Sequence, residues 1–161
     1  MNASSAIDKF LKNFSTRFDA DLQNQLNAQG YSLADILTVA SLIEKEAAND
    51  DERPVIASVI YNRLNSGWTL GLESSVLYLH QDHEGAPTQE MLDEDTPYNV
   101  MKNAGLPPTP ICCPGLSSIK AALNPGVTNY YYFTLDTATG THRFFTSGDE
   151  FNAFVSTQNY E

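Results

Sequence analysis

Residues 33–48 read LADILTVASLIEKEAA, and this stretch decides the fold. Apolar side chains recur in it every three or four residues, which predicts an amphipathic helix. The centre of its apolar face is formed by Ile36, Ala40, Ile43 and Ala47. Ser32, followed three residues later by Asp35, predicts a capping box that starts the helix.

Two carboxylates flank this apolar face. At about 100° per residue, Glu44 falls on one side of the face and Glu46 on the other, whereas Lys45 points outward with Thr38 and Ser41. A carboxylate at the edge of an apolar face is partly desolvated, and desolvation raises its pKa. A raised pKa is what a general acid needs near neutral pH. The helix thus offers two candidates for a general acid, and helix geometry does not choose between them.

A structural interpretation of these two glutamates is the alternative. Both are then boundary residues that are solvated, or paired with Arg53 or Arg63. Carboxylates in such positions are more often structural than catalytic.

Other helices follow from the same periodicity and from end signals. Residues 6–28 show helical spacing, and Gly30 is a stop signal. A third helix starts at residues 51–54, where acidic residues and a proline suit a helix N-terminus, and it ends before Gly67. Shorter helices are expected at residues 74–81, 88–92, 116–123 and 148–156, the last opened by a capping box of Ser147 and Glu150.

Two regions are not helical. Residues 104–115 hold four prolines and two glycines, which predicts a rigid, extended loop. Residues 130–135 and 142–146 have the character of strands around a turn that contains Thr139-Gly140. Helices first and a hairpin later predict an α+β fold, a mostly helical domain with a C-terminal β-hairpin or small antiparallel sheet.

Composition narrows the function classes. The chain has 161 residues, of which 42% are hydrophobic, enough for the core of one domain. No apolar run approaches the roughly 18 to 20 residues of a membrane helix, and we expect no signal peptide. The net charge of −11 repels phosphate groups, so nucleic acid and anionic lipid are not expected as partners. Neutral or zwitterionic polymers such as glycans are still possible partners.

The cysteines do not indicate a disulfide framework or a metal site. Cys112 and Cys113 are adjacent, so they cannot join distant segments. With only three scattered histidines beside them, His80, His83 and His142, a structural zinc site is not expected. We interpret the cysteines as two small, half-buried side chains in a loop.

The string LTVASLIEKEAANDDERPVIASVIYNRL at residues 37–64 is followed by further motifs in a fixed order. These motifs are Thr96-Pro97-Tyr98-Asn99, Gly105-Leu106-Pro107-Pro108, Pro110-Ile111, Pro114-Gly115, Ala121-Ala122-Leu123-Asn124-Pro125, Tyr131-Tyr132-Phe133, and His142 with Phe144. Over roughly residues 33–155 the chain resembles the endolytic peptidoglycan (murein) transglycosylases, the YceG-like family. The resemblance implies an N-terminal helix over residues 1–31, a catalytic domain over 32–156 and a tail over 157–161.

The resemblance also implies a reaction. The second glutamate of the Glu-Lys-Glu motif is catalytic in that family, which selects Glu46 over Glu44. Glu46 would protonate the oxygen between N-acetylmuramic acid and N-acetylglucosamine within a glycan strand, through an oxocarbenium-like state. The same carboxylate would then take the proton of the muramoyl C6 hydroxyl, which closes on C1 to leave a 1,6-anhydro end. One carboxylate suffices because the nucleophile comes from the substrate, and no metal or organic cofactor is implied.

Substrate-binding residues are suggested in the same way. Tyr98 and Asn99 resemble a Tyr-Asn pair of lytic transglycosylases. Tyr98 would then contact the acid or the sugar, and Asn99 an acetamido group. The alternative is a buried tyrosine that caps a loop. Arg53, Asn62 and Arg63 would hold the cleft or contact the peptide stem, with helix packing and ion pairing as the alternative.

The chain departs from the family pattern at several positions. Glu73-Ser74-Ser75 stands where Asp-Pro-Thr is usual, so Glu73 keeps the negative charge on a longer arm. Ala47, Cys113 and Phe151 replace a usual Thr, Asn and His. At most two of the aromatic residues at 130–133 are candidates for sugar stacking, because strand alternation sends the others to the core. Trp68 is a further candidate, with a place in the core as the alternative.

The family is usually membrane-anchored by an N-terminal helix, which we expect to lie outside this sequence. The resemblance therefore implies the extracytoplasmic face of the cytoplasmic membrane, with peptidoglycan glycan strands as substrate and peptidoglycan synthases of the elongation machinery as partners. Two alternatives remain. One is a hydrolytic, muramidase-like glycosidase, and the other is a non-catalytic cell-wall glycan-binding or scaffold module.

Overall fold

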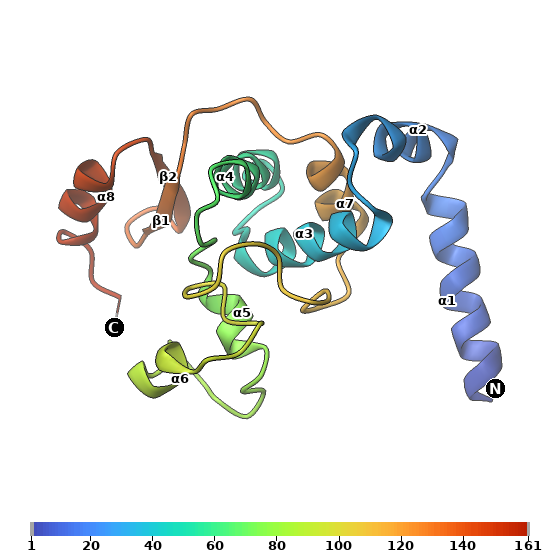
Figure 1. The fold of residues 1–161 in the computed structure, drawn as a ribbon, viewed down its shortest axis with the longest axis horizontal. Helices are drawn as coiled ribbons and strands as arrows, with labels where there is room; N and C mark the ends of the chain where they lie inside the picture. The colour runs from blue at the N-terminus through green and yellow to red at the C-terminus, as the bar shows by residue number, and fades with distance from the viewer. Residues whose placement is uncertain (1, 161) are drawn as a thin grey trace.

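The computed structural model describes residues 2–160, so residues 1 and 161 of the expected N-terminal segment and tail lie outside it. Eight helices and one two-stranded antiparallel sheet follow one another along these residues (Figure 1). The elements are α1 (Ala3–Arg17), α2 (Ala20–Gln29), α3 (Leu33–Glu46), α4 (Arg53–Asn65), α5 (Glu73–Leu77), α6 (Gln89–Asp93), α7 (Leu116–Leu123), β1 (Tyr132–Asp136), β2 (Thr141–Phe145) and α8 (Gly148–Val155). The expected α+β class, mostly helical with a C-terminal hairpin, is confirmed.

Helix α3 lies at the centre of the core and packs against α4 and α7. Its predicted capping box is present, since Ser32 Oγ accepts from Asp35 N (3.1 Å) and Ser32 N donates to Asp35 Oδ2 (3.0 Å). The expectation that Thr38 and Ser41 point outward is wrong, because both are buried. The proline-rich loop covers this side of the helix, and Ile111 N donates to Ser41 Oγ (2.9 Å). The helix is therefore enclosed on nearly all sides until its last turn.

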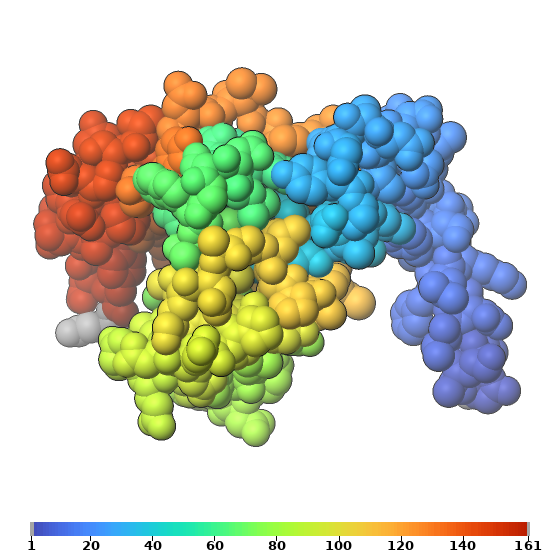
Figure 2. All heavy atoms as spheres, viewed as in Figure 1, coloured from blue at the N-terminus to red at the C-terminus, as the bar shows by residue number. Residues whose placement is uncertain are grey.

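The N-terminal segment is two helices rather than one. Asp19 interrupts the predicted helix over residues 6–28, because its side chain accepts from Asp21 N and Leu22 N as the N-cap of α2. Helix α2 buries Leu22 and Leu26 in the core, whereas α1 has no buried residue. Figure 2 shows α1 projecting from the body of the molecule, at the end opposite the hairpin and α8.

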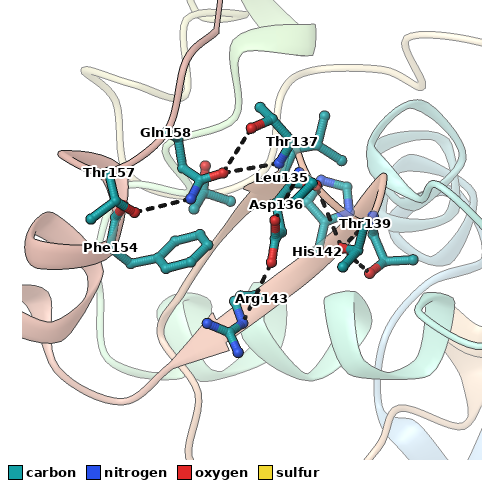
Figure 3. Close-up of polar contacts among 12 residues, drawn as sticks. Leu135, Asp136, Thr137, Thr139, His142, Arg143, Phe154, Thr157 and Gln158 are labelled. Carbon is teal, nitrogen blue, oxygen red and sulfur yellow. Dashed lines mark hydrogen bonds and ion pairs between the residues drawn. The ribbon is translucent and has the colours of Figure 1, made fainter.

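The C-terminal unit is a hairpin with a helix packed on it. Strands β1 and β2 pair antiparallel, with Phe133 opposite Phe144 and Leu135 opposite His142. Arg143 lies over the Phe154 ring of α8 at 5.0 Å from its centroid (Figure 3). Such contacts make β1, β2 and α8 one wall of the molecule.

The residues after α8 also attach to the hairpin. Gln158 Oε1 accepts from the backbone N–H (2.9 Å) and the hydroxyl (3.0 Å) of Thr137 in the hairpin turn (Figure 3). The cap of α8 differs from the prediction, because Ser147 Oγ accepts from Asp149 N (3.2 Å) and makes no such bond to Glu150. Within residues 2–160, no helix combines the length and apolar character needed to cross a membrane.

The two cysteines are free thiols in the proline-rich loop. Cys112 is partly buried and its Sγ donates to Ser41 O (3.4 Å), whereas Cys113 is exposed rather than half-buried. Burial raises the pKa of the Cys112 thiol.

Candidate active site

Glu46 is the last residue of α3, at the point where the helix leaves the core. Its side chain borders a cavity of about 680 Å³. The cavity wall is formed by residues of α4, α5, the segment between them, the hairpin and α8, among them Arg63, Gly71, Glu73, Tyr132, His142 and Phe151. The end of α3, three other helices and the hairpin thus converge on one carboxyl group.

The Glu46 carboxyl lies in surroundings that favour its protonated form. Burial, the largest effect, raises its pKa, and the negative charge of Glu73 acts in the same direction. A hydrogen bond from Ser74 Oγ to Glu46 Oε1 (2.5 Å) and the charge of His142 act in the opposite direction without reversing the result. Its place at the C-terminal end of α3 also disfavours an anion there. Glu46 therefore has the electrostatics of a general acid.

Glu44 lies in the opposite situation. Its Oε2 accepts from Ser118 Oγ (2.6 Å) and Gly115 N (3.0 Å) and pairs with Arg53 Nη1 (3.3 Å). Burial alone would raise its pKa, but these hydrogen bonds and the arginine charge hold the pKa below its usual value. The geometry thus separates two glutamates that the helix pattern left equivalent, with Glu44 as a structural anion between α3, α4 and α7.

His142 of β2 borders the same cavity and is hydrogen-bonded to Glu52. Its Nδ1 lies 2.8 Å from Glu52 Oε2, and its backbone N–H donates to Glu52 Oε1 (2.8 Å). Glu52 is the residue before α4 and is only 7% exposed. Burial opposes ionisation of Glu52, but hydrogen bonds from His142 and Ala48 hold its pKa below the usual value.

Arg63 and Glu73 are the sequence-predicted binding residues that border the cavity. Arg63 Nε donates to Tyr131 O (2.6 Å) and its Nη1 to Leu70 O (2.6 Å), so it joins the hairpin to the segment before α5. Its guanidinium carbon lies 5.4 Å from the centroid of the Tyr132 ring. Glu73 is exposed and starts α5.

Two other predicted residues lie outside this wall. Arg53 pairs with Asp50 (2.7 Å) and Glu44 and donates to Ser118. These contacts correspond to the alternative role for Arg53, ion pairing between helices. Asn62 Nδ2 donates to Thr128 O (3.0 Å) and Tyr130 O (2.9 Å), so it fastens the chain leading to the hairpin.

The Tyr98-Asn99 pair does not border the Glu46 cavity. Tyr98 packs against Tyr78 and its hydroxyl bonds to Thr109 Oγ1 (2.9 Å). Asn99 is fully buried, and its amide donates to Leu92 O and Glu94 O (both 2.9 Å) while Oδ1 accepts from Met101 N (3.1 Å). In this structure the pair organises the loop after α6.

Aromatic rings extend the cavity toward the surface. Tyr132 stacks with Phe151 inside it (centroids 5.5 Å apart) and meets Trp68 edge-on (6.1 Å). Trp68 also packs on Tyr131 and is 45% exposed. A ring left this open beside a cavity offers a flat surface to a ligand.

Sequence reasoning missed three side chains of the site: Ser74 and His142, which act on Glu46, and Glu52, which holds His142. The first replaces a usual proline, and the other two become neighbours only when β2 docks on the start of α4. Ser74 and His142 were quoted only as motif residues, and nothing local in the sequence connects them to the acid. Among residues 2–160, no three His, Cys, Asp or Glu side chains are grouped as metal ligands would be.

Comparisons with known proteins show the family of the chain. Residues 1–157 match the model of the YceG-like family, which includes both N-terminal helices. An endolytic murein transglycosylase of Bacillus subtilis (strain 168) is 42% identical over 111 residues, which cover 69% of this chain and 31% of that protein. An endolytic murein transglycosylase of Streptococcus pneumoniae is 30% identical over 147 residues, 85% of this chain and 26% of that protein.

A solved structure has the same fold. The crystal structure of a YceG-like protein from Listeria monocytogenes aligns with a TM-score of 0.88 and 38% sequence identity, over 95% of this chain and 50% of that chain. This chain therefore spans a third or less of the curated relatives and half of the solved one.

Proposed function

Because the chain belongs to the YceG-like family, we propose that it cleaves peptidoglycan glycan strands internally, as a lytic transglycosylase. The names of its curated relatives support this substrate class. The observation that carries the proposal is the position of Glu46, a partly buried carboxyl with a raised pKa on the wall of a 680 Å³ cavity.

In the proposed reaction Glu46 acts twice. As an acid it gives its proton to the oxygen between N-acetylmuramic acid and N-acetylglucosamine, and the bond from that oxygen to the muramoyl C1 breaks. The carboxylate then accepts the proton of the C6 hydroxyl, whose oxygen bonds to C1. The acid is restored, no water is consumed, and the new end is a 1,6-anhydro sugar. A group that serves as acid and then as base needs a pKa near the working pH, which partial burial supports.

Substrate contacts are proposed where the cavity wall offers them. Arg63 and Glu73 present charges to the cavity, suited to the carboxylate and amine groups of a peptide stem. Tyr132 and Trp68 present rings for sugar faces. Arg53, Asn62, Tyr98 and Asn99 contribute by holding the surrounding helices and loops.

The test is digestion of purified peptidoglycan, followed by mass spectrometry of the glycan ends. The wild-type chain is expected to give 1,6-anhydro ends, and Glu46→Gln none. Glu44→Gln is the matched control on the same helix, and it retains activity where circular dichroism shows it folded. Equal yields of anhydro ends from wild type and Glu46→Gln would contradict the proposal. Activity that is retained in Glu46→Gln and lost in Glu44→Gln would contradict it as well.

One observation favours a second candidate, a hydrolytic glycosidase. Glu73 places another carboxylate on the wall of the Glu46 cavity, and hydrolysis by two carboxyl groups needs such a partner. The variant Glu73→Gln separates the two functions. Lytic cleavage persists in it because the nucleophile belongs to the sugar, whereas hydrolysis requires the Glu73 carboxylate.

The same variants address a non-catalytic role. A glycan-binding or scaffold module would retain glycan binding and show no turnover in either wild type or Glu46→Gln. We further propose that the chain acts outside the cytoplasmic membrane, where peptidoglycan lies, alongside synthases of the elongation machinery. Co-purification of the chain with such synthases from cross-linked cells checks the partner.

A further inference from the structure

The Glu52 carboxylate is a buried anion with four donors. Ala48 N (3.1 Å) and His142 Nδ1 (2.8 Å) donate to Oε2, whereas Asn49 Nδ2 (3.2 Å) and His142 N (2.8 Å) donate to Oε1. A carboxylate buried to 7% exposure and saturated with donors stays ionised. Because it can only accept, the proton between the two side chains belongs to His142 Nδ1.

This arrangement fixes the imidazole ring. With Nδ1 held by Glu52, the other ring nitrogen, Nε2, makes no hydrogen bond to any residue within 2–160. Phe133 and Phe144 pack on the ring at centroid distances of 5.3 and 6.5 Å. The ring is thus locked in orientation while its side chain borders the Glu46 cavity.

We propose that His142, held by the buried Glu52, is a positioning residue that presents positive charge to Glu46 and stabilises the carboxylate formed when the acid gives up its proton. This inference rests on the proposed function. The Glu46 anion exists only after proton transfer, so a charge fixed opposite it favours the later states of the reaction. His142 exchanges no proton with the sugar, and the proton balance given for Glu46 is unchanged.

The other groups around Glu46 do not replace this charge. From α5, Ser74 donates a neutral hydrogen bond and Glu73 adds negative charge. From α4, Arg63 borders the cavity, but its charge is not among the effects that shift the pKa of Glu46. From β1, Tyr132 adds a phenol. His142 is the cation whose charge opposes the effect of burial on Glu46.

The test is a titration that does not depend on turnover. Side-chain carboxyl signals of ¹³C-glutamate-labelled protein are followed by NMR across pH, with Glu46 assigned from the Glu46→Gln spectrum. In His142→Gln we expect the Glu46 midpoint to move upward by about half a pH unit or more. His80→Gln is the matched control, because His80 pairs with Glu94 (3.2 Å) outside the cavity, and it leaves the midpoint unchanged.

A second variant and a wild-type measurement guard against misfolding. Glu52→Gln keeps His142 but removes the anion that holds its charge, so the same upward shift is expected. In the wild-type protein, ¹⁵N–¹H correlation of the imidazole is expected to show both Nδ1 and Nε2 protonated at the pH of the activity assay, because only the doubly protonated ring carries a positive charge. A Glu46 midpoint unmoved in the folded variants, or a neutral imidazole with one protonated nitrogen in wild type, overturns the inference.

Activity provides the final readout. A general acid loses activity as pH rises through its pKa. In His142→Gln the higher Glu46 pKa is therefore expected to move the alkaline limb of the pH–rate profile to higher pH, and the maximal rate is expected to fall. If wild type forms no anhydro ends, the proposed function fails, and the NMR titration still decides the coupling. If wild type forms anhydro ends and the Glu46 midpoint does not move in His142→Gln, this inference fails and the proposed function stands.

Discussion

The Ser74 hydroxyl lies 2.5 Å from Glu46 Oε1 and connects the start of α5 to the end of α3. It holds one carboxyl oxygen of the candidate acid and leaves the other without a hydrogen bond to the described residues. A proline, usual at this position in the family, has no hydroxyl to make this bond. The Ser74 hydroxyl thus orients the candidate acid from the start of α5.

Removal of this hydroxyl is expected to slow the reaction and shift its pH dependence. The Ser74 bond lowers the pKa of Glu46, so in Ser74→Ala the pKa rises further and the alkaline limb of kcat moves to higher pH. We expect a loss of about tenfold in kcat, equivalent to about 1.4 kcal/mol of barrier. The exposed Ser117→Ala on α7 is the control. An alkaline limb unchanged in Ser74→Ala would show that the hydroxyl does not govern the acid.

Glu46 is expected to reduce stability at neutral pH. Its folded pKa is raised above the ordinary value of 4.5, so the folded state binds the proton more tightly than the unfolded state does. Stability is then greatest below the unfolded pKa and falls as pH rises through the folded pKa. Glu46→Gln, which mimics the protonated form, should therefore melt about 2–4 °C above wild type at pH 7.

The difference in Tm between Glu46→Gln and wild type should shrink toward zero below about pH 4, because Glu46 is then protonated in both the folded and the unfolded state. Scanning calorimetry from pH 3 to pH 8 measures it. A Glu46→Gln protein that melts below wild type at neutral pH would contradict the assigned burial.

Gly71 is expected to be needed for the position of Arg63. Its φ of +66° lies in the left-handed region, and a Cβ there would collide with Arg63 Nη1. Gly71→Ala should cost more than the roughly 1–2 kcal/mol of left-handed strain, because the guanidinium must also move. Gly67→Ala is the matched control, with a φ of +68° and open space around the added methyl. Urea unfolding of both variants measures the difference, and equal losses would argue against the collision.

Trp68 is expected to contribute to glycan binding rather than to stability. Its ring is 45% exposed beside Tyr132, so truncation removes a contact surface at little cost to the core. Trp68→Ala should weaken binding of glycan fragments about fivefold, on the scale of one aromatic contact. Leu79→Ala removes a comparably exposed side chain elsewhere. Calorimetric binding that is equal for the two variants would remove Trp68 from the site.

Local signals predicted most of the helical scaffold. The Ser32–Asp35 capping box fixed the start of α3, and the spacing of apolar residues located α4 and α7 within a few residues. The same spacing failed at Asp19, because an N-cap inside a periodic stretch breaks the helix without disturbing its pattern. It also failed at Ser41, since the loop that buries this hydroxyl lies 70 residues away.

The candidate site was less accessible to sequence reasoning. Helix geometry reduced the acid to Glu44 or Glu46. What distinguishes them is the burial of Glu46 and the hydrogen bonds that Ser118 and Gly115 donate to Glu44, and both depend on elements distant in sequence. Asn99 shows the reverse failure. A polar motif residue suggested a sugar contact, whereas its amide is consumed by backbone carbonyls in the interior.

The role of Glu46 is tested most directly by digesting peptidoglycan in H₂¹⁸O. Lytic cleavage closes the sugar on its own C6 oxygen, so the account predicts 1,6-anhydro ends that carry no ¹⁸O, and loss of these ends in Glu46→Gln. Reducing N-acetylmuramic acid ends that each carry one ¹⁸O would mean that water is the nucleophile, and they would contradict the account.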